Sequence, residues 1–177
     1  MRLVKAFLFV AIGLFIFITL FSLLIPFHVR VSRAVVINNA NAGGVYKQVA
    51  IFENWKNWHP FFTVDSARIY WYPPGIAGKD SGCIIKHRGH DVKIKLISAD
   101  TTNIKFLLQV AGENDISSEI VITPLPGRQA VQVEWRAITK LHWYPWEKFY
   151  GIFIDKLTGP GYDAALNGLK DYFEKHS

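Results

Sequence analysis

Two closely spaced histidines are the first side chains to consider as metal ligands. His87 and His90 are separated by Arg88-Gly89, a pair typical of a hairpin turn, and Asp91 is the one carboxylate beside them. A structural zinc site takes four protein ligands, and a catalytic zinc site takes three. The spacing therefore favours two exposed histidines at a turn, and we predict no metal site.

Groups suited to covalent or acid–base catalysis are sparse. The sequence has no Gly-x-Ser-x-Gly motif and no glycine-rich phosphate loop, and Cys83 has no convincing histidine partner. Asp155 and Glu53 are candidates for a general acid or base, but that role requires burial beside a ligand and a shifted pKa. Asp155, which precedes Lys156, also fits the polar side of a helix. We therefore assign no catalytic residue and no cofactor.

Aromatic side chains are concentrated between Phe52 and Phe62. Seven of these eleven residues are aromatic, histidine or proline. Trp55 and Trp58 are one turn apart on a helix, and both can be buried plugs whose indole N–H groups need acceptors. Alternatively one of them, Trp58 beside Pro60, lines the mouth of a cavity.

A second aromatic cluster, His142-Trp143-Tyr144-Pro145-Trp146, connects the last predicted strand to the last predicted helix. It can pack against the edge of the sheet, or it can cover a pocket as a lid. It can also contact a membrane, since Trp and Tyr favour the headgroup zone. The residues alone leave these three interpretations open.

Hydrophobic periodicity predicts the elements that position both clusters. A Val-rich strand is expected at 28–37, followed by a short helix at 44–52 that asparagines can cap and that ends before Pro60. Short strands with two-residue alternation and turn signals every ~8–12 residues indicate an antiparallel sheet with one wet face. Six such strands are expected at residues 68–72, 83–88, 91–98, 104–110, 116–122 and 130–141.

Two of these strands show which face of the sheet is apolar. Phe106 and Leu108 fall on one face of the first, and Val133 and Trp135 fall on one face of the second, opposite three polar residues. We predict that these four side chains face the concave side of the sheet and the last helix.

An apolar stripe predicts a long helix at the end of the chain. Its residues recur at helical spacing on both sides of Gly159-Pro160-Gly161. Because proline and glycine weaken a helix, we predict a kink or a break at this tripeptide. The stripe consists of Phe149, Phe153, Leu157, Tyr162, Leu166, Leu169 and Phe173.

The N-terminus predicts a membrane anchor at residues 1–27. Ala6–Phe27 is uncharged over 22 residues, and roughly 20 apolar residues span a hydrocarbon core as a helix. This run is longer than the ~7–15 apolar residues of a signal peptide, and the small-x-small sequence Ala40-Asn41-Ala42 lies too far beyond it. A basic tip before an apolar run resembles an export signal. We therefore predict an uncleaved single-pass helix in the cell membrane and an extracytoplasmic domain.

Residues 28–177 are predicted to form one domain. The net charge of +6 at pH 7 falls to +4 without Arg2 and Lys5. The basic residues are dispersed among acidic ones, which argues against a nucleic-acid partner. Cys83 is the only cysteine, so no internal disulfide can form.

The order of these elements and three stretches of sequence resemble the START-like helix-grip superfamily. More narrowly, the chain resembles bacterial SRPBCC proteins of the polyketide cyclase/dehydrase-like type that carry an N-terminal anchor. The stretches are Val35–Tyr46, Asn54–Pro60 with the pattern N-W-x-x-W-x-P, and Gly151–Lys170. Two positions depart from the family pattern: Asn39-Ala40-Asn41 replaces a proline before the first helix, and Gly161 replaces an acidic residue.

The resemblance implies an α+β helix-grip fold, in which a seven-stranded antiparallel sheet curves around a long C-terminal helix and two short helices follow the first strand. It also implies a hydrophobic cavity, but it does not imply a reaction. We therefore expect a membrane-anchored domain that binds a hydrophobic small molecule or lipid. A cyclase/dehydrase-type enzyme with a buried Asp, Glu or His in the cavity, and an interaction module with a filled core, are the alternatives.

The expected ligand-binding residues come from both aromatic clusters, the concave face of the sheet and the last helix. Trp58 and the loop from Trp143 to Trp146 are expected to border the cavity entrance near the bilayer, because both lie at connections between elements. The full set is Trp55, Trp58, Phe106, Leu108, Val133, Trp135, Trp143 and Phe153.

Overall fold

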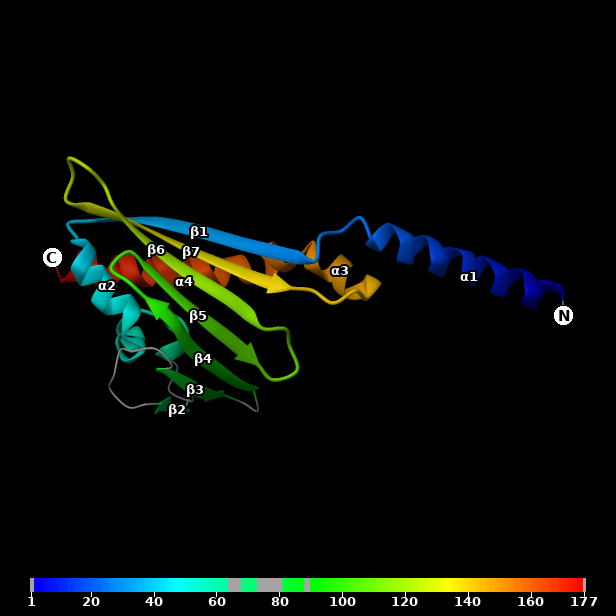
Figure 1. The fold of residues 1–177 in the computed structure, drawn as a ribbon, viewed down its shortest axis with the longest axis horizontal. Coiled ribbons are helices and arrows are strands. Elements are labelled where there is room, and N and C mark those ends of the chain that lie inside the picture. The colour runs from blue at the N-terminus through cyan, green and yellow to red at the C-terminus, as the bar shows by residue number, and fades with distance from the viewer. Residues whose placement is uncertain (1, 64–67, 73–80, 88–89, 177) are drawn as a thin grey trace.

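A computed structural model describes residues 2–63, 68–72, 81–87 and 90–176. A seven-stranded antiparallel sheet lies against a long C-terminal helix, and an apolar N-terminal helix projects from one end (Figure 1). This arrangement confirms the predicted helix-grip architecture. The elements are α1 (Arg2–Ser22), β1 (His28–Asn38), α2 (Ala42–Ala50), η1 (Phe52–Asn57), η2 (Pro60–Phe62), β2 (Arg68–Tyr72), β3 (Gly82–His87), β4 (His90–Ala99), β5 (Asn103–Val110), β6 (Ile116–Pro124), β7 (Ala130–Lys140), α3 (Pro145–Gly151) and α4 (Ile154–Lys175).

The sheet has the strand order β1-β7-β6-β5-β4-β3-β2, so only β1 is separated from its sequence neighbour. Each predicted strand is present, although Arg88, the predicted end of one, lies outside the described residues. The register of β4 against β5 shifts between Leu96 and Ser98. Such an irregularity bends a strand and increases its twist, which helps the sheet curve.

The aromatic segment 52–62 forms two short 3-10 helices after α2. Asn41 caps α2, because its side-chain oxygen accepts the backbone N–H of Gly44 at 2.6 Å. Pro60 occupies the first turn of η2, where its missing N–H leaves no partner unsatisfied. The predicted helix at 44–52 therefore lies at 42–50, and the tryptophans lie on η1 and at its end.

The C-terminal helix differs from the prediction in where it is interrupted. The interruption falls at residues 152–153, between α3 and α4, and α4 continues through Pro160. Pro160 lies on the exposed side of α4, so water can reach the carbonyl of Lys156 that a proline leaves without a partner. The stripe also splits: Phe153 and Leu157 are exposed, whereas Leu166 and Leu169 are buried.

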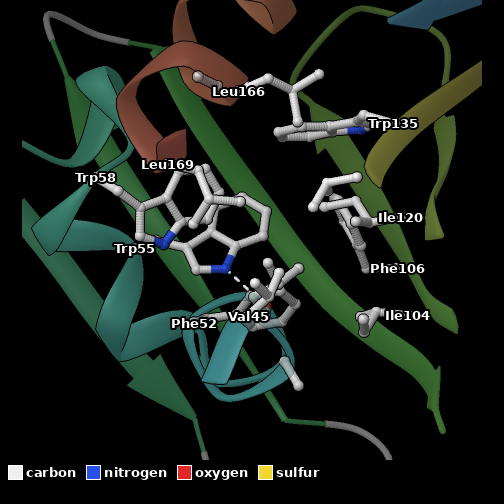
Figure 2. Close-up of a cluster of buried hydrophobic side chains, with 14 of the residues drawn as sticks. Val45, Phe52, Trp55, Trp58, Ile104, Phe106, Ile120, Trp135, Leu166 and Leu169 are labelled. Carbon is white, nitrogen blue, oxygen red and sulfur yellow. Dashed lines mark hydrogen bonds between the residues drawn. The ribbon is translucent and has the colours of Figure 1, made fainter. Parts of the chain in front are cut away.

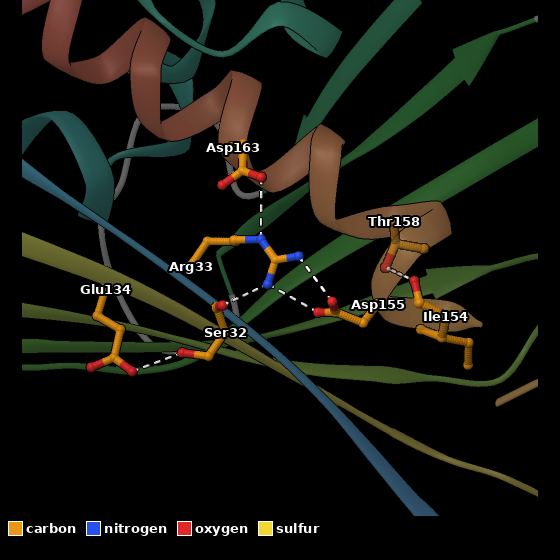
Figure 3. A network of polar contacts seen from close by, with 7 residues as sticks. All are labelled: Ser32, Arg33, Glu134, Ile154, Asp155, Thr158 and Asp163. Atoms are coloured by element: carbon orange, nitrogen blue, oxygen red, sulfur yellow. Dashed lines mark hydrogen bonds and ion pairs between the residues drawn. The ribbon is translucent and has the colours of Figure 1, made fainter. Parts of the chain in front are cut away.

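An ion-pair network joins Arg33 of β1 to Asp155 and Asp163 of α4 (Figure 3). These two carboxylates precede and follow Pro160 in the sequence. Arg33 of β1 donates through both terminal nitrogens to Asp155, at 2.9 and 3.1 Å, and through Nε to Asp163 at 3.2 Å. These contacts lower the pKa of Asp155. A Cβ on Gly159 would lie 2.2 Å from the Arg33 guanidinium, so the guanidinium passes α4 where a side chain is absent. The Arg33 side chain thus bridges the turns of α4 that precede and follow Pro160.

The main core lies between the concave face of the sheet, α2, η1 and the second half of α4 (Figure 2). Trp55 is its most connected ring, with T-shaped contacts to Phe52, Phe106 and Trp135 at 5.1 to 5.6 Å. Phe106, Val133 and Trp135 are buried and Leu108 is partly buried against them, as the alternation predicts.

We predict that Gly159→Ala destabilises the protein when residue 33 is arginine and stabilises it when residue 33 is alanine. Alanine normally stabilises a helix interior by about 1 kcal/mol over glycine. In the natural chain the new Cβ should displace the Arg33 guanidinium from both carboxylates and lower the melting temperature. In an Arg33→Ala background the same substitution should raise it.

Thermal unfolding of the four chains of this double-mutant cycle, solubilised in one detergent, checks the prediction. Gly161→Ala is the matched control, since a Cβ there meets no atom within 4 Å. Additive effects of Gly159→Ala and Arg33→Ala would contradict the proposed role of the network.

Candidate ligand cavity

A cavity of about 640 Å³ lies between η2, the strands β4, β5 and β7, and the first half of α4. It occupies the part of the sheet–helix interface that the core side chains leave open. Its lining consists of Trp55, His59, Pro60, Phe61, Phe62, Val92, Ile94, Leu108, Val110, Trp135, Thr158, Gly161, Tyr162 and Ala164.

The chemistry of this lining is apolar. Among the described residues that form it, only His59, Thr158 and Tyr162 carry an imidazole or a hydroxyl group, and none carries a formal charge at neutral pH. Aliphatic side chains of β4 and β5 form one wall, and aromatic rings of η1, η2 and β7 form another. Such a cavity has the size and polarity of a small-molecule site with few polar contacts.

His59 is the most unusual group in the cavity. Its ring stacks on Trp55 with centroids 5.2 Å apart and planes at 9°, and its Nδ1 accepts the backbone N–H of Phe61 at 3.2 Å. Burial lowers the pKa of His59 to about 4. The ring is therefore neutral at physiological pH, and because Nδ1 is an acceptor, its proton is on Nε2.

Two further groups in the cavity wall have polar atoms beside apolar surface. Tyr162 packs edge-on against Trp135 with centroids 5.1 Å apart, and burial raises the pKa of its hydroxyl. The indole nitrogen of Trp135 is buried without a hydrogen-bond partner among the described residues. At neutral pH both side chains are uncharged hydrogen-bond donors.

The predicted binding residues fall into three groups in the structure. Trp55, Leu108 and Trp135 line the cavity, whereas Phe106 and Val133 lie in the core behind the lining. Trp58 is also buried, and its indole N–H donates to the carbonyl of Gln48 at 3.1 Å. It packs against α4 at Gly168, so it closes the core instead of bordering this cavity.

The predicted shared entrance of Trp58 and the Trp143–Trp146 loop requires correction. Trp58 follows η1, near α2, whereas Trp143 precedes α3, next to the end of α1 (Figure 1). These connections lie at opposite ends of the sheet because β1 and β7 run its full length. Trp143 and Phe153 are exposed at 62% and 54%, and the described cavity lining contains neither.

The catalytic candidates lie elsewhere. Asp155 is paired with Arg33, and neither it nor Glu53 is among the described lining residues. Burial raises the pKa of the Cys83 thiol to about 12, which makes it a poor nucleophile. His87 and His90 pair across β3 and β4, but their side chains are outside the described set. Within that set, no three His, Cys, Asp or Glu residues are grouped to hold a metal ion.

Several lining residues were missed at the level of sequence. The two-residue alternation that includes Leu108 also predicts an inward orientation for Val92, Ile94 and Val110. It does not predict that these side chains lie near α4. His59 lies inside the aromatic motif, in which only the two tryptophans are predicted to bind a ligand. Tyr162 follows the Gly-Pro-Gly sequence, which had suggested an interruption there.

Comparisons with known proteins agree with this geometry. Residues 28–174 match the family model described as polyketide cyclase / dehydrase and lipid transport. No curated protein sequence matches the chain.

Solved structures with the same fold are distant in sequence. A START superfamily protein from Mycobacterium smegmatis is 18% identical with a TM-score of 0.64, covering 84% of this chain and 99% of that one. A protein from Thermobifida fusca is 13% identical with a TM-score of 0.64, covering 82% and 93%. A norcoclaurine synthase point mutant from Thalictrum flavum, in complex with a transition-state analogue, is 14% identical with a TM-score of 0.61, covering 84% and 96%.

At these identities the structural matches establish the fold alone, and family membership is shown by the match to the family model. The chain belongs to the polyketide cyclase/dehydrase and lipid transport family, and its fold is the helix-grip fold of the START superfamily.

Proposed function

We propose that the protein binds an apolar small molecule or a lipid chain in the cavity between the sheet and α4. The observation that carries the proposal is the lining of a roughly ligand-sized space by apolar side chains, with no charged residue among those described. A cavity of about 640 Å³ argues against the filled-core interaction module, because pockets that bind small molecules have volumes of about 300–1,000 Å³.

The polar groups of the lining favour a particular ligand chemistry. His59 presents an Nε2–H and Tyr162 a protonated hydroxyl, and both are neutral donors. A ligand with one uncharged oxygen acceptor, such as an alcohol, ketone or ester, suits these donors. A carboxylate would enter a low-dielectric space in which no described lining residue compensates its charge.

A cyclase/dehydrase-type enzyme is the second candidate, and His59 is the observation that favours it. A partly buried histidine that lines an apolar cavity is the type of acid–base residue that such a reaction requires. However, a general base works best when its pKa lies near the operating pH, and the pKa of His59 is about 4. His59 is therefore better suited to donate a hydrogen bond than to remove a proton, which makes binding the first candidate.

Membrane attachment through α1 is part of the same proposal. α1 is long and apolar enough to cross a membrane, with a mean hydropathy of 2.6. A retained anchor and a signal sequence share these properties, but the contacts beyond α1 favour retention. Lys148 of α3 is fully buried, donates to the carbonyl of Ile25 at 2.8 Å, and lies 3.4 Å above the ring of Phe27. Cleavage after Phe27 would leave this ammonium group without either contact.

Filling the cavity should abolish ligand binding without unfolding the protein. We expect Leu108→Phe/Val110→Phe to weaken the binding of brominated dodecanol at least about tenfold, or about 1.4 kcal/mol. The measurement is bromine quenching of Trp55 and Trp135 in the full chain, held in nanodiscs, with Trp143 and Trp146 replaced by Phe.

Leu107→Phe/Gln109→Phe is the matched control, because these residues alternate with Leu108 and Val110 and lie on the outer face of β5. It should bind like the parent. Equal affinities for both filled variants would place the bound alcohol outside the cavity.

The buried neutral state of His59 should make stability depend on pH. The unfolded chain protonates near pH 6.5 and the folded chain near pH 4, so the unfolded state binds more protons between these values. Folding stability should therefore fall as pH decreases from 6.5 towards 4, by up to about 3 kcal/mol.

His59→Asn, which keeps an acceptor for the Phe61 N–H, should flatten this dependence in denaturant titrations at several pH values. His28→Asn, at an exposed site, should not. Parallel pH profiles for the natural chain and His59→Asn would show that His59 is not buried in its neutral form.

Retention of the anchor predicts the mass of the mature protein. Intact mass spectrometry of the protein purified from cell membranes should give a chain that includes residues 1–27. A mature chain that starts after Phe27, including one that starts beside Ala42, would contradict the proposal.

A further inference from the structure

Six large apolar side chains are exposed within fifteen residues around α3 and the start of α4. Each of them is more than half exposed, and exposed large apolar side chains that gather in one region mark an interaction site. We call this the α3–α4 surface. It consists of Trp143 (62%), Trp146 (67%), Tyr150 (55%), Ile152 (56%), Phe153 (54%) and Leu157 (58%).

The α3–α4 surface is continuous with the end of α1. Phe149 of α3 stacks on Phe21 of α1 with centroids 6.1 Å apart and planes at 9°. The neighbouring Lys148 binds the carbonyl of Ile25. These contacts fix α3 beside the last turn of α1, as Figure 1 shows.

The composition of the surface matches the boundary between lipid and water. Tryptophan and tyrosine are enriched in the headgroup zone because their rings are apolar and their N–H or O–H groups remain hydrated. Lys156, which is exposed between Phe153 and Leu157, adds an ammonium group that can meet lipid phosphates. If α1 crosses the bilayer, α3 can only lie at the surface of the same leaflet.

The surface also leads to the cavity. Phe153 and Leu157 are followed at helical spacing by Gly161 and Ala164, both of which line the cavity. Leu157 and Gly161 are about one turn, or ~6 Å, apart along α4.

The sheet places the opposite wall of the cavity at the same end. Val92 pairs with Val110 where β4 begins and β5 ends. β6 begins beside Thr139 of β7, and Thr139 pairs with Val29, which follows α1 closely in the chain. Thus this wall reaches the end of the sheet that lies nearest the anchor.

We propose that the α3–α4 surface is a second bilayer contact, seated in the headgroup zone of the leaflet that holds the C-terminal end of α1. It turns the anchor-side end of the cavity towards that leaflet and provides an apolar track from the acyl chains to Gly161 and Ala164. The proposed bilayer contact requires only that α1 is a retained membrane anchor. The proposed track rests in addition on the proposed binding function.

The contact can be tested with the full chain in phosphatidylcholine nanodiscs, with and without bromine near the top of the acyl chains. The chain has six tryptophans, and Trp143 and Trp146 are the two on this surface. Bromine should quench the natural chain, and Trp143→Phe/Trp146→Phe should remove most of that quenching. Trp71→Phe, which replaces a partly buried ring of β2 outside the described cavity lining, is the control and should leave the bromine-dependent loss unchanged. Equal bromine-dependent losses in the natural chain and the double variant would overturn the contact.

The track can be tested in chains that carry Trp143→Phe/Trp146→Phe, by the rate at which brominated dodecanol, delivered in phosphatidylcholine vesicles, quenches Trp55 and Trp135. Phe153→Asp/Leu157→Asp should slow this quenching at least about tenfold and leave its final extent unchanged. Ile97→Asp is the matched control at an exposed apolar site on the sheet, and it should behave like the parent. Equal rates would overturn the track, while absent quenching in every chain, the parent included, would refute the binding function and leave the bilayer contact to the nanodisc result.

Discussion

The burial of Trp55 is the interaction on which the rest of the structure depends. Its indole N–H donates to the carbonyl of Val49 at 2.8 Å, so the ring satisfies its one polar group inside the core. Its edges then contact Phe106 and Trp135 on the sheet (Figure 2). The ring of His59 stacks on its face with the two planes at 9°. One side chain thereby joins the short helices to the sheet, forms the inner wall of the cavity, and supplies the apolar surface that keeps His59 neutral.

The cavity exists because the side chains on α4 change in size along the helix. In its second half, Leu166 and Leu169 are fully buried and fill the space above Trp55 and Trp58. In its first half, Gly161 and Ala164 leave the facing surface of β4 and β5 uncovered. A helix with two different halves therefore gives one sheet a packed core at one end and an open space at the other. The ion pairs from Arg33 add to a second apolar cluster, formed by Ile154 with Val31 and Leu141, in holding the open half in place.

The sequence was sufficient for the strands and their buried face, because the two-residue period of β5 and β7 is a local property of each strand. It was insufficient for the C-terminal helix, because the position of its interruption depends on distant residues. Gly151 lies so close to Leu141 that a Cβ would be 2.4 Å from its side chain, and this close packing fixes α3 against β7. Arg33, more than a hundred residues earlier, braces α4 across Pro160. The position of His59 in the cavity likewise follows from tertiary packing, which a motif cannot reveal.

The contact between Lys148 and the end of α1 couples the fold to the apolar N-terminal helix. A buried ammonium group is costly unless nearby groups replace its hydration. Here the carbonyl of Ile25 and the ring of Phe27 do so, and both precede the first strand. The backbone carbonyl of Phe27 also accepts the N–H of Leu141, which lies just after β7. The connection between α1 and the sheet is thus part of the folded structure and not a free linker. Movement of the domain relative to α1 would have to break these contacts, so the orientation of the cavity relative to that helix is set by the same residues that complete the fold.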